Sequence, residues 1–329
     1  MGATADQIHC GPYTSGRKTL IDAARFAVET PRLAGEIQAL IRRHDADLLY
    51  VNGPRVLPAA ALANMPVLFH CHSYLAGAAR RLAGWSLRRA QASVVASCRF
   101  VAEPLGPYAR GIKVVYNGVR PCLYPRRRGA GMRIGVIGRI APEKGQADFL
   151  RAARLVYPDL PDARFLIYGA PLFASAAAIA YSTGLQALAK DLPVEFAGWT
   201  QNVDEVLATL DLLVVPSTAI DATPRVILEA FAAGVPVVAF AAGGIPEMIE
   251  HNVTGFLVRE SSPEALAAAL REVLRGEPER LCEMAERARI KALSDFSLER
   301  YREQMMEALN TAAGQARLNR NRGATESRR

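Results

Sequence analysis

Residues 211–240 read DLLVVPSTAIDATPRVILEAFAAGVPVVAF, and this stretch decides the fold class. Apolar runs at 211–217 and 235–240 are rich in Val and have the length of buried strands. Between them, Thr223 is predicted as the N-cap of a helix and Pro224 as its first residue, where the missing N–H costs nothing. Gly234 predicts the end of that helix. Strand, helix and strand in this order indicate a parallel βαβ unit.

The same alternation extends along the chain in both directions, and a segment rich in Pro, Gly and Arg at 125–133, PRRRGAGMR, interrupts it. The strands predicted before this break are DLLYVNG (47–53), PVLFHCHS (66–73), ASVVAS (92–97) and IKVVYNG (112–118). Those predicted after it are RIGVIGR (133–139), ARFLIYG (163–169), PVEFAGW (193–199), DLLVVPS (211–217), VPVVAF (235–240) and TGFLV (254–258). Before the first strand, RLAGEIQALIRRH (32–44) has helical periodicity.

This pattern predicts an α/β protein with two doubly wound, Rossmann-like domains facing a central cleft, where ligands of such folds bind. The predicted parts are a first domain at 1–127, a second at 131–295, a C-terminal helix at 296–313 and a disordered basic tail at 314–329. Only four strands are visible before the break, so we expect the first domain to be incomplete, lacking one or more β-α units.

Composition narrows the class of partner. Of the net charge of +8, the segments 126–128 and 316–329 contribute +3 and +4, so the folded parts are near neutral and a nucleic-acid partner is not expected. The longest apolar runs have strand length, and the first residues contain no apolar signal region. The 5 cysteines show no paired spacing, which favours reduced thiols and a cytoplasmic location.

Two loops that follow predicted strands have the chemistry of an anion site. The amides of Arg225 and Val226 start a helix, where free N–H groups and the helix dipole favour negative charge. Glu229 falls on the second turn of that helix. Asp221 lies in the loop before it. An exposed Glu on a capped core helix is the alternative for this segment.

The loop after the strand at 133–139 offers two cations, Arg139 and Lys144, in the stretch GRIAPEKG (138–145). This loop lacks the Ser or Thr of a phosphate-binding Walker loop and the GxGxxG pattern of a dinucleotide fold. Arg and Lys at a helix start can bind a diphosphate, although such residues are also common in solvated loops.

Taken together, GRIAPEKG, FLIYG, VEFAGW, VVPS, the acid-containing stretch at 221–240 and GGIPEMI…TGFLV resemble, in order, the retaining glycosyltransferases of family 4. These are the glycosyl transferases group 1, which have the GT-B fold. The resemblance covers about residues 45–300 and is strongest at 132–258. It implies an acceptor-side domain at 1–127 and a domain at 131–295 that binds a nucleotide sugar.

The resemblance implies a role for each matching donor-side residue. Arg139 and Lys144 neutralise the donor diphosphate, next to the backbone at Gly138. Glu229 holds the ribose hydroxyls, and Asp221 contacts the donor sugar, although the family has Glu at that position.

The loop at 199–202, led by Trp199, falls where the family holds the nucleotide base. The alternative is that Trp199 only packs between the domains. Gly243 and Gly244 are interpreted as turn residues. In the first half, HCHSYL (70–75) matches the strand end with the active-site histidine, most simply His72, and a core or capping role is the alternative. This half lacks the family's first strand and Gly-rich loop.

The resemblance further implies a metal-independent, hexosyltransferase-type enzyme that transfers a sugar with retention, by front-face attack of a glycan or lipid-linked acceptor. The expected process is envelope polysaccharide biosynthesis. No cofactor is expected beyond the nucleotide-sugar substrate. An inactive or binding-only protein of this fold and a nucleotide-sugar epimerase remain alternatives. A peripheral membrane contact at the inner face is a further hypothesis, because AARRLAGWSLRRA (78–90) carries Arg80, Arg81 and Arg88 on one side of a helix near Trp85.

Overall fold

The computed structural model describes residues 6, 8, 19–109, 111–127, 131–171, 176–218 and 220–326, with the backbone alone at 20 and 315–326. The chain forms two compact units, one of Met1–Val115 with Glu303–Arg329 and one of Tyr116–Arg302. The division lies ahead of the basic segment at 125–133, because the chain after Val115 bonds to the second unit. The Val119 N–H donates to the Phe296 carbonyl at 2.8 Å, and the Arg127 N–H donates to the Ala208 carbonyl at 2.7 Å.

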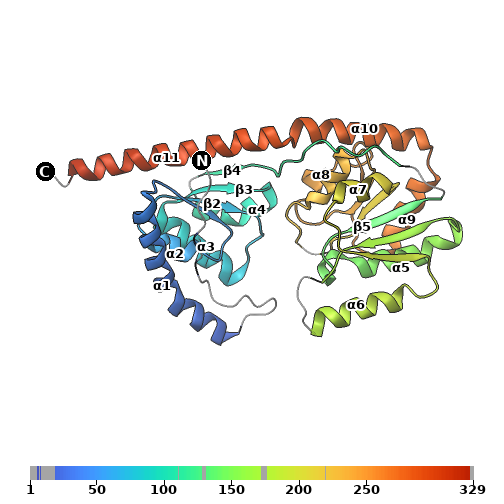
Figure 1. Ribbon diagram of the computed structural model, residues 1–329, viewed down its shortest axis with the longest axis horizontal. Coiled ribbons are helices and arrows are strands. Elements are labelled where there is room, and N and C mark those ends of the chain that lie inside the picture. Colours follow the sequence, from blue (N-terminus) through green and yellow to red (C-terminus); the bar gives the residue numbers. More distant parts are fainter. Residues whose placement is uncertain are drawn as a thin grey trace. The chain divides into compact units, whose positions relative to one another are not determined.

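The first unit contains the four strands predicted for it, alternating with helices (Figure 1). Its elements are α1 (Leu20–His44), β1 (Leu49–Asn52), α2 (Leu57–Leu62), β2 (Val67–Cys71), α3 (Gly77–Ala90), β3 (Ser93–Ala96), α4 (Arg99–Ala102), the 3₁₀ helix η1 (Glu103–Tyr108) and β4 (Ile112–Val114). The strands are all parallel, in the order β1-β2-β3-β4. The core combines residues of β1, β2 and β3 with residues of α2, α3 and η1, and Phe69 of β2 is fully buried in it.

The second unit contains the six strands predicted for it. It begins with β5 (Arg133–Ile137), η2 (Pro142–Lys144), α5 (Gln146–Val156), η3 (Tyr157–Asp159), β6 (Arg164–Tyr168), α6 (Ala176–Leu188), β7 (Val194–Gly198), α7 (Val203–Thr209) and β8 (Leu212–Val215). It continues with α8 (Arg225–Ala232), β9 (Val237–Phe240), η4 (Ile245–Glu247), β10 (Phe256–Val258), α9 (Pro263–Arg275) and α10 (Pro278–Asp295).

All six strands are parallel, in the order β10-β9-β8-β5-β6-β7. The chain starts in the middle at β5, moves to β6 and β7 on one side, and returns to β8 on the other. The loops that leave β5 and β8 therefore run to opposite sides of the sheet. In parallel α/β sheets such a reversal opens a crevice at the carboxyl ends of the strands.

Alternating strand residues form two apolar layers, one on each face of this sheet. One layer includes Phe165 and Val214 and packs under α5, α6 and α9. The other includes Leu166 and Leu213 and packs under α7, α8 and α10. Helices thus cover both faces, and the polar residues that could bind a ligand are left to the strand ends.

The last helix, α11 (Leu298–Glu326), begins in the second unit, and its residues from Glu303 onward belong to the first unit. Its backbone is helical past residue 314, where the composition predicts a disordered tail. The segment contains no proline, and Ala, Gln, Arg and Leu continue a helix readily.

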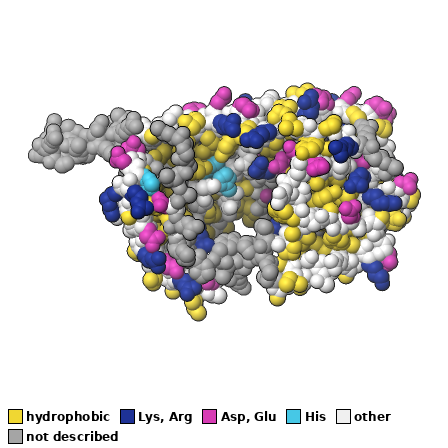
Figure 2. Space-filling view, viewed as in Figure 1, with side chains coloured by type: hydrophobic (Ala, Val, Ile, Leu, Met, Phe, Trp, Pro, Cys, Tyr) yellow, Lys and Arg dark blue, Asp and Glu magenta, His cyan; other side chains and the backbone are white. Residues whose placement is uncertain are grey.

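None of the described helices combines the length and apolar character needed to span a membrane. Acidic and basic side chains are interspersed over the visible face of the molecule (Figure 2), as expected for folded parts that are close to neutral.

Candidate functional site

A small cavity of about 20 Å³ lies where the strand order reverses, between the ends of β5 and β8. Residues from both strand ends, η2, α5 and the start of α8 line it: Val136, Ile137, Gly138, Lys144, Gln146, Val214, Val215, Pro216, Ser217, Pro224 and Val226. Three residues predicted for the site, Gly138, Lys144 and Val226, are among them. This cavity is the centre of the candidate site.

Lys144 and Asp221, predicted on separate loops, form an ion pair. The Lys144 Nζ lies 2.6 Å from the Asp221 Oδ2, and the side chains are 28% and 17% exposed. The Ser217 hydroxyl donates a second hydrogen bond to the same carboxylate oxygen at 2.9 Å, and Ser217 is almost fully buried. The only cation that lines the small cavity among the described residues is therefore paired with a carboxylate.

The two loops approach each other closely at Gly145, which follows Lys144. Gly145 has φ +71°, and a Cβ there would lie 1.7 Å from the Pro216 carbonyl oxygen. The Thr218 N–H also donates to the Glu143 carbonyl at 3.1 Å. These backbone contacts set the position of Lys144 relative to the end of β8.

Arg139 lies one residue past the cavity-lining Gly138, and its side chain is 34% exposed. Its guanidinium pairs with the Glu143 Oε1 at 2.5 Å. Its backbone carbonyl accepts a hydrogen bond at 2.8 Å from the side chain of Gln146, which is fully buried. Sequence reasoning missed Gln146, Glu143 and Ser217 as site residues. Each lies inside a motif already singled out, and the signal for Gln146 is a polar residue at a buried helix start.

The helix α8 begins one residue later than predicted. Pro224 is its N-cap, with φ −64° and ψ 108°, and makes no side-chain capping bond. The prediction of Thr223 as N-cap is wrong, because the Thr223 Oγ1 instead accepts a hydrogen bond from the Asn117 Nδ2 at 2.9 Å. Arg225 and Val226 are therefore the first two helical residues, whose amides lack partners within a helix.

Glu229 lies on α8 with its side chain 19% exposed. Burial raises the pKa of this carboxyl above its usual value, and the Arg225 guanidinium, 3.3 Å away, acts in the opposite direction. The nearby Asp204 raises the pKa of Glu229 further. Glu229 is thus a partly desolvated carboxylate with one flexible cationic neighbour, since the Arg225 side chain is 67% exposed.

Gly243 and Gly244 support the loop of Asp221. The Gly244 N–H donates to the Asp221 carbonyl at 2.9 Å. Gly243 has φ +57°, and a Cβ there would lie 2.1 Å from the same carbonyl oxygen. These glycines thus have the turn geometry expected of them, and they fix the backbone of Asp221.

Trp199 follows β7 and does not line the small cavity. It is 61% exposed. In the same loop, Asn202 caps α7 by accepting a hydrogen bond from the Glu205 N–H at 3.3 Å. The Asn202 amide also donates to the Tyr124 hydroxyl at 2.6 Å. Trp199 therefore offers an accessible aromatic face on a loop that Asn202 holds in place.

His72 belongs to the first unit, just past the end of β2 at Cys71. The rings of His70 and His72, which are two positions apart, lie 3.9 Å from each other. His70 is fully buried, and the Tyr50 hydroxyl lies 2.6 Å from its Nδ1. Burial, helped by His72, lowers the pKa of His70 to about 4, and burial also lowers the pKa of His72.

Among the described side chains, no three His, Cys, Asp or Glu residues gather in a way that could hold a metal ion. The charged groups in and around the small cavity are instead Lys144, Arg139, Asp221 and Glu143, together with the first turn of α8.

Comparison with known proteins identifies related sequences along both units. Residues 131–276 match the family described as glycosyl transferases group 1, and residues 11–121 match Glycosyltransferase Family 4. The crystal structure of HepE from Anabaena, in complex with UDP and glucose, superposes with a TM-score of 0.75 at 25% identity, over 85% of this chain and 81% of that chain.

Two curated relatives are similar over most of this chain. An exopolysaccharide phosphotransferase of Streptomyces coelicolor is 30% identical over 249 residues, 73% of this chain and 26% of that protein. The sulfoquinovosyl transferase of Arabidopsis thaliana is 27% identical over 284 residues, 74% of this chain and 52% of that protein. The chain thus spans about a quarter to a half of these relatives.

The two family matches together reach from the first unit to α9, and the fold superposes on HepE over 85% of this chain. The chain belongs to glycosyltransferase family 4, with the GT-B fold.

Proposed function

We propose that this chain is a glycosyltransferase that moves a sugar from a nucleotide-diphosphate sugar to a glycan or glycolipid acceptor, in polysaccharide or glycolipid assembly. The observation that carries the proposal is the position of Lys144, beside the first turn of α8 at the strand-order reversal. The relatives support it: HepE is solved with UDP and with UDP-glucose, and a similar Salmonella typhimurium protein bears the name of a putative colanic acid biosynthesis glycosyltransferase.

In this proposal the donor diphosphate lies over the small cavity. Lys144 and Arg139 bind its oxygens, and the amides of Arg225 and Val226 add the positive end of a helix dipole. The backbone at Gly138 offers close approach without a side chain. These groups are on short loops between packed elements, so they are held in place before the donor arrives.

The nucleoside and the sugar of the donor extend in two directions from the diphosphate. Glu229, buried on α8, accepts hydrogen bonds from the ribose hydroxyls, and the exposed face of Trp199 stacks on the base. Asp221 accepts a hydrogen bond from the sugar and releases Lys144 to the phosphate when the donor binds. The ion pair between Lys144 and Asp221 is thus exchanged for contacts of both groups with the donor.

The chemistry follows from where charge develops. Breaking the bond between sugar and diphosphate places negative charge on the departing phosphate, and Lys144, Arg139 and the α8 amides stabilise it electrostatically. These cations supply the charge neutralisation that a divalent metal gives in other transferases, so we propose a metal-independent reaction. We further propose that the acceptor attacks the anomeric carbon of the sugar from the side on which the diphosphate leaves, so that the configuration is retained. His72 lies on the acceptor side in this proposal.

A cytoplasmic location is part of the proposal. The four described cysteines are free thiols, two of them buried, as is usual in reducing compartments.

The test starts with the nucleotide. Thermal shifts of the chain with UDP, GDP and ADP identify the base. The corresponding sugar nucleotides are then assayed for release of the nucleoside diphosphate, with glycan and glycolipid fractions as acceptors. Turnover that persists in EDTA supports metal independence, and the anomeric configuration of the product reports retention or inversion.

The same assay distinguishes the alternatives. A nucleotide that stabilises the protein without any product identifies a binding-only protein. Conversion of the sugar nucleotide without an acceptor identifies an epimerase. Either result contradicts the proposed transferase.

A further inference from the structure

The helix α3 of the first unit presents a basic face that the proposed reaction does not use. Its inner face is fixed by the buried residues Ala83, Gly84, Ser86 and Leu87. Its sequence, GAARRLAGWSLRRA, contains four arginines and no acid. The arginines at 81, 88 and 89 are all exposed, and Arg80 is less exposed. The Arg80 Cζ lies 5.7 Å from the centre of the Tyr108 ring.

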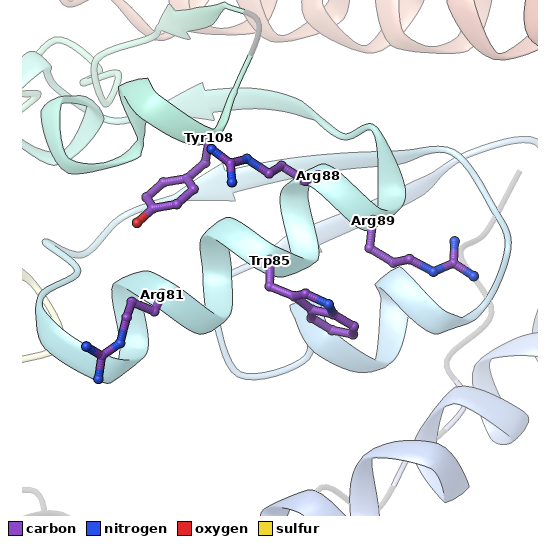
Figure 3. A pocket seen from close by; sticks show the side chains of 5 residues that line it. All are labelled: Arg81, Trp85, Arg88, Arg89 and Tyr108. Atoms are coloured by element: carbon purple, nitrogen blue, oxygen red, sulfur yellow. The ribbon is translucent and has the colours of Figure 1, made fainter.

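This basic face borders a cavity of about 430 Å³, lined by Arg81, Trp85, Arg88, Arg89 and Tyr108 (Figure 3). The four helical residues are spaced at i, i+4, i+7 and i+8, so they lie on one side of α3. Figure 3 shows Trp85 between Arg81 and Arg89, with all three side chains on the same side of the helix. We refer to these five lining residues as the α3 arginine face.

Neutral partners hold part of this face in position. The Arg88 Cζ lies 4.9 Å from the centre of the Tyr108 ring, and Arg88 donates to the Pro107 carbonyl at 2.9 Å. The Tyr108 ring packs so closely on Gly84 that a Cβ there would lie 2.3 Å from it. Arg89 donates to the Asn64 side-chain oxygen at 3.3 Å. The guanidinium groups of Arg88 and Arg89 are thus oriented without being neutralised.

The charge of the α3 arginine face is uncompensated. Within the described part of the chain, none of its arginines lies within 4.0 Å of a carboxylate oxygen. By contrast, Arg25 and Arg32 on α1 each have a glutamate partner one turn away. Three guanidinium groups that line one cavity without a carboxylate partner can each bind phosphate oxygens bidentately.

Exposed apolar side chains beside these arginines indicate which phosphate-bearing partner fits. Trp85 is 47% exposed and Leu82 is 40% exposed. A free phosphate ion uses only the guanidinium groups and leaves both apolar side chains in water. A lipid surface uses all of them, because Trp lies favourably at the headgroup level while Arg binds the lipid phosphates.

We propose that the α3 arginine face, with Leu82, is a docking surface for an anionic membrane, in which arginines bind lipid phosphates and Trp85 inserts at the headgroup level. The surface would bring the first unit to lipid independently of donor binding. It goes beyond the proposed transfer reaction, and a protein that fails to turn over a sugar nucleotide could still bind vesicles in this way.

The experiment is co-sedimentation of the full chain with vesicles of phosphatidylcholine alone and of phosphatidylcholine mixed with phosphatidylglycerol. We expect binding only to the mixed vesicles, and loss of binding at high salt. The double variant Arg81→Gln, Arg89→Gln should weaken partitioning by roughly 30-fold, since each basic residue near an anionic surface contributes about 1 kcal/mol. Trp85→Ala should weaken it several-fold and leave the salt dependence in place.

The matched control is the double variant Arg25→Gln, Arg32→Gln, which lowers the net charge by the same amount on another helix of the first unit. It should bind the mixed vesicles nearly as the unchanged protein does. Equal loss in both double variants, or equal binding to both kinds of vesicle, would overturn the proposal. Release from vesicles by soluble glycerol phosphate at constant ionic strength would also overturn it, and would identify a site for a free phosphate ligand. Thermal unfolding of each variant establishes that it is folded.

Discussion

The Nζ of Lys144 lies 2.6 Å from the Oδ2 of Asp221, and this ion pair joins the loops that follow β5 and β8. In the proposed reaction these residues bind different parts of the donor, the diphosphate and the sugar. Their contact keeps a partly buried cation and a partly buried carboxylate mutually neutralised. Donor binding must therefore exchange one ion pair for two new contacts, which makes both residues sensitive reporters.

Removing the cation should slow the reaction. Lys144→Ala and Arg139→Ala should each cost about 2–4 kcal/mol of transition-state stabilisation, or roughly 30- to 1000-fold in kcat/KM. The measurement is the initial rate of nucleoside-diphosphate release at several donor concentrations. Lys190→Ala, at an exposed lysine past α6, is the control and should be nearly silent. Unchanged turnover in both loop variants would show that the diphosphate lies elsewhere.

Neutralising the carboxylate should separate turnover from nucleotide binding. Asp221→Asn should leave the affinity for the free nucleotide intact or slightly improved, because Lys144 loses its competing partner. It should lower the rate by roughly ten- to a hundred-fold, the effect of losing a charge-assisted hydrogen bond of about 1.5–3 kcal/mol. Titration of nucleotide beside rate measurements tests this. A large fall in nucleotide affinity would mean that Asp221 only stabilises its loop.

Most of this site could be predicted from the sequence because its parts are local. Strand ends and helix starts follow from short apolar runs and from residues such as Pro224, so Lys144 could be placed in the loop after a strand and Val226 at a helix start. The contacts between these parts could not be predicted. The ion pair of Lys144 and Asp221 joins residues 77 positions apart, and the bond that occupies Thr223 comes from Asn117, 106 positions away. Such pairings depend on how the sheet is assembled.

The first unit shows the same distinction. His70 and His72 are two positions apart, and residues at that spacing in a strand lie on one face, so the 3.9 Å between their rings is a local feature. The contact of His70 with the Tyr50 hydroxyl, 20 positions away, depends instead on the pairing of β1 with β2.

The main effect of Glu229→Gln should be weaker nucleotide binding. The side chain is the proposed acceptor for the ribose hydroxyls, and an amide replaces a charge-assisted hydrogen bond by a neutral one. Folding should not suffer, since burial raises the pKa of Glu229 and the ionised form is therefore disfavoured in the folded protein. We expect a lower nucleotide affinity with an unchanged or slightly raised Tm. A clear drop in Tm without a change in nucleotide affinity would assign Glu229 a structural role.

The close approach at Gly145 predicts a backbone effect on the site. Gly145→Ala introduces a Cβ that would lie 1.7 Å from the Pro216 carbonyl, at a φ of +71° that disfavours other residues. Separation of the loops should cost about 1–3 kcal/mol of stability and displace Lys144. Gly184→Ala is the matched control, because a Cβ at this position of α6 would have no atom within 4 Å. It should be neutral or stabilise by up to about 1 kcal/mol. Equal Tm values for the two variants would contradict the close approach.

The buried His70 predicts acid sensitivity of the first unit. Its pKa is lowered to about 4 in the folded protein, from an ordinary value of 6.5, so the unfolded chain takes up a proton first as the pH falls. Stability should therefore be full above pH 6.5 and decline toward pH 4, by on the order of 2–4 kcal/mol in total. His70→Gln should flatten this slope in urea unfolding, even if its absolute stability differs, because the slope depends only on proton uptake. A residual slope is expected, since the pKa of His72 is also lowered by burial. An identical slope in the variant and the unchanged protein would show that His70 is protonated equally in the folded and unfolded chains.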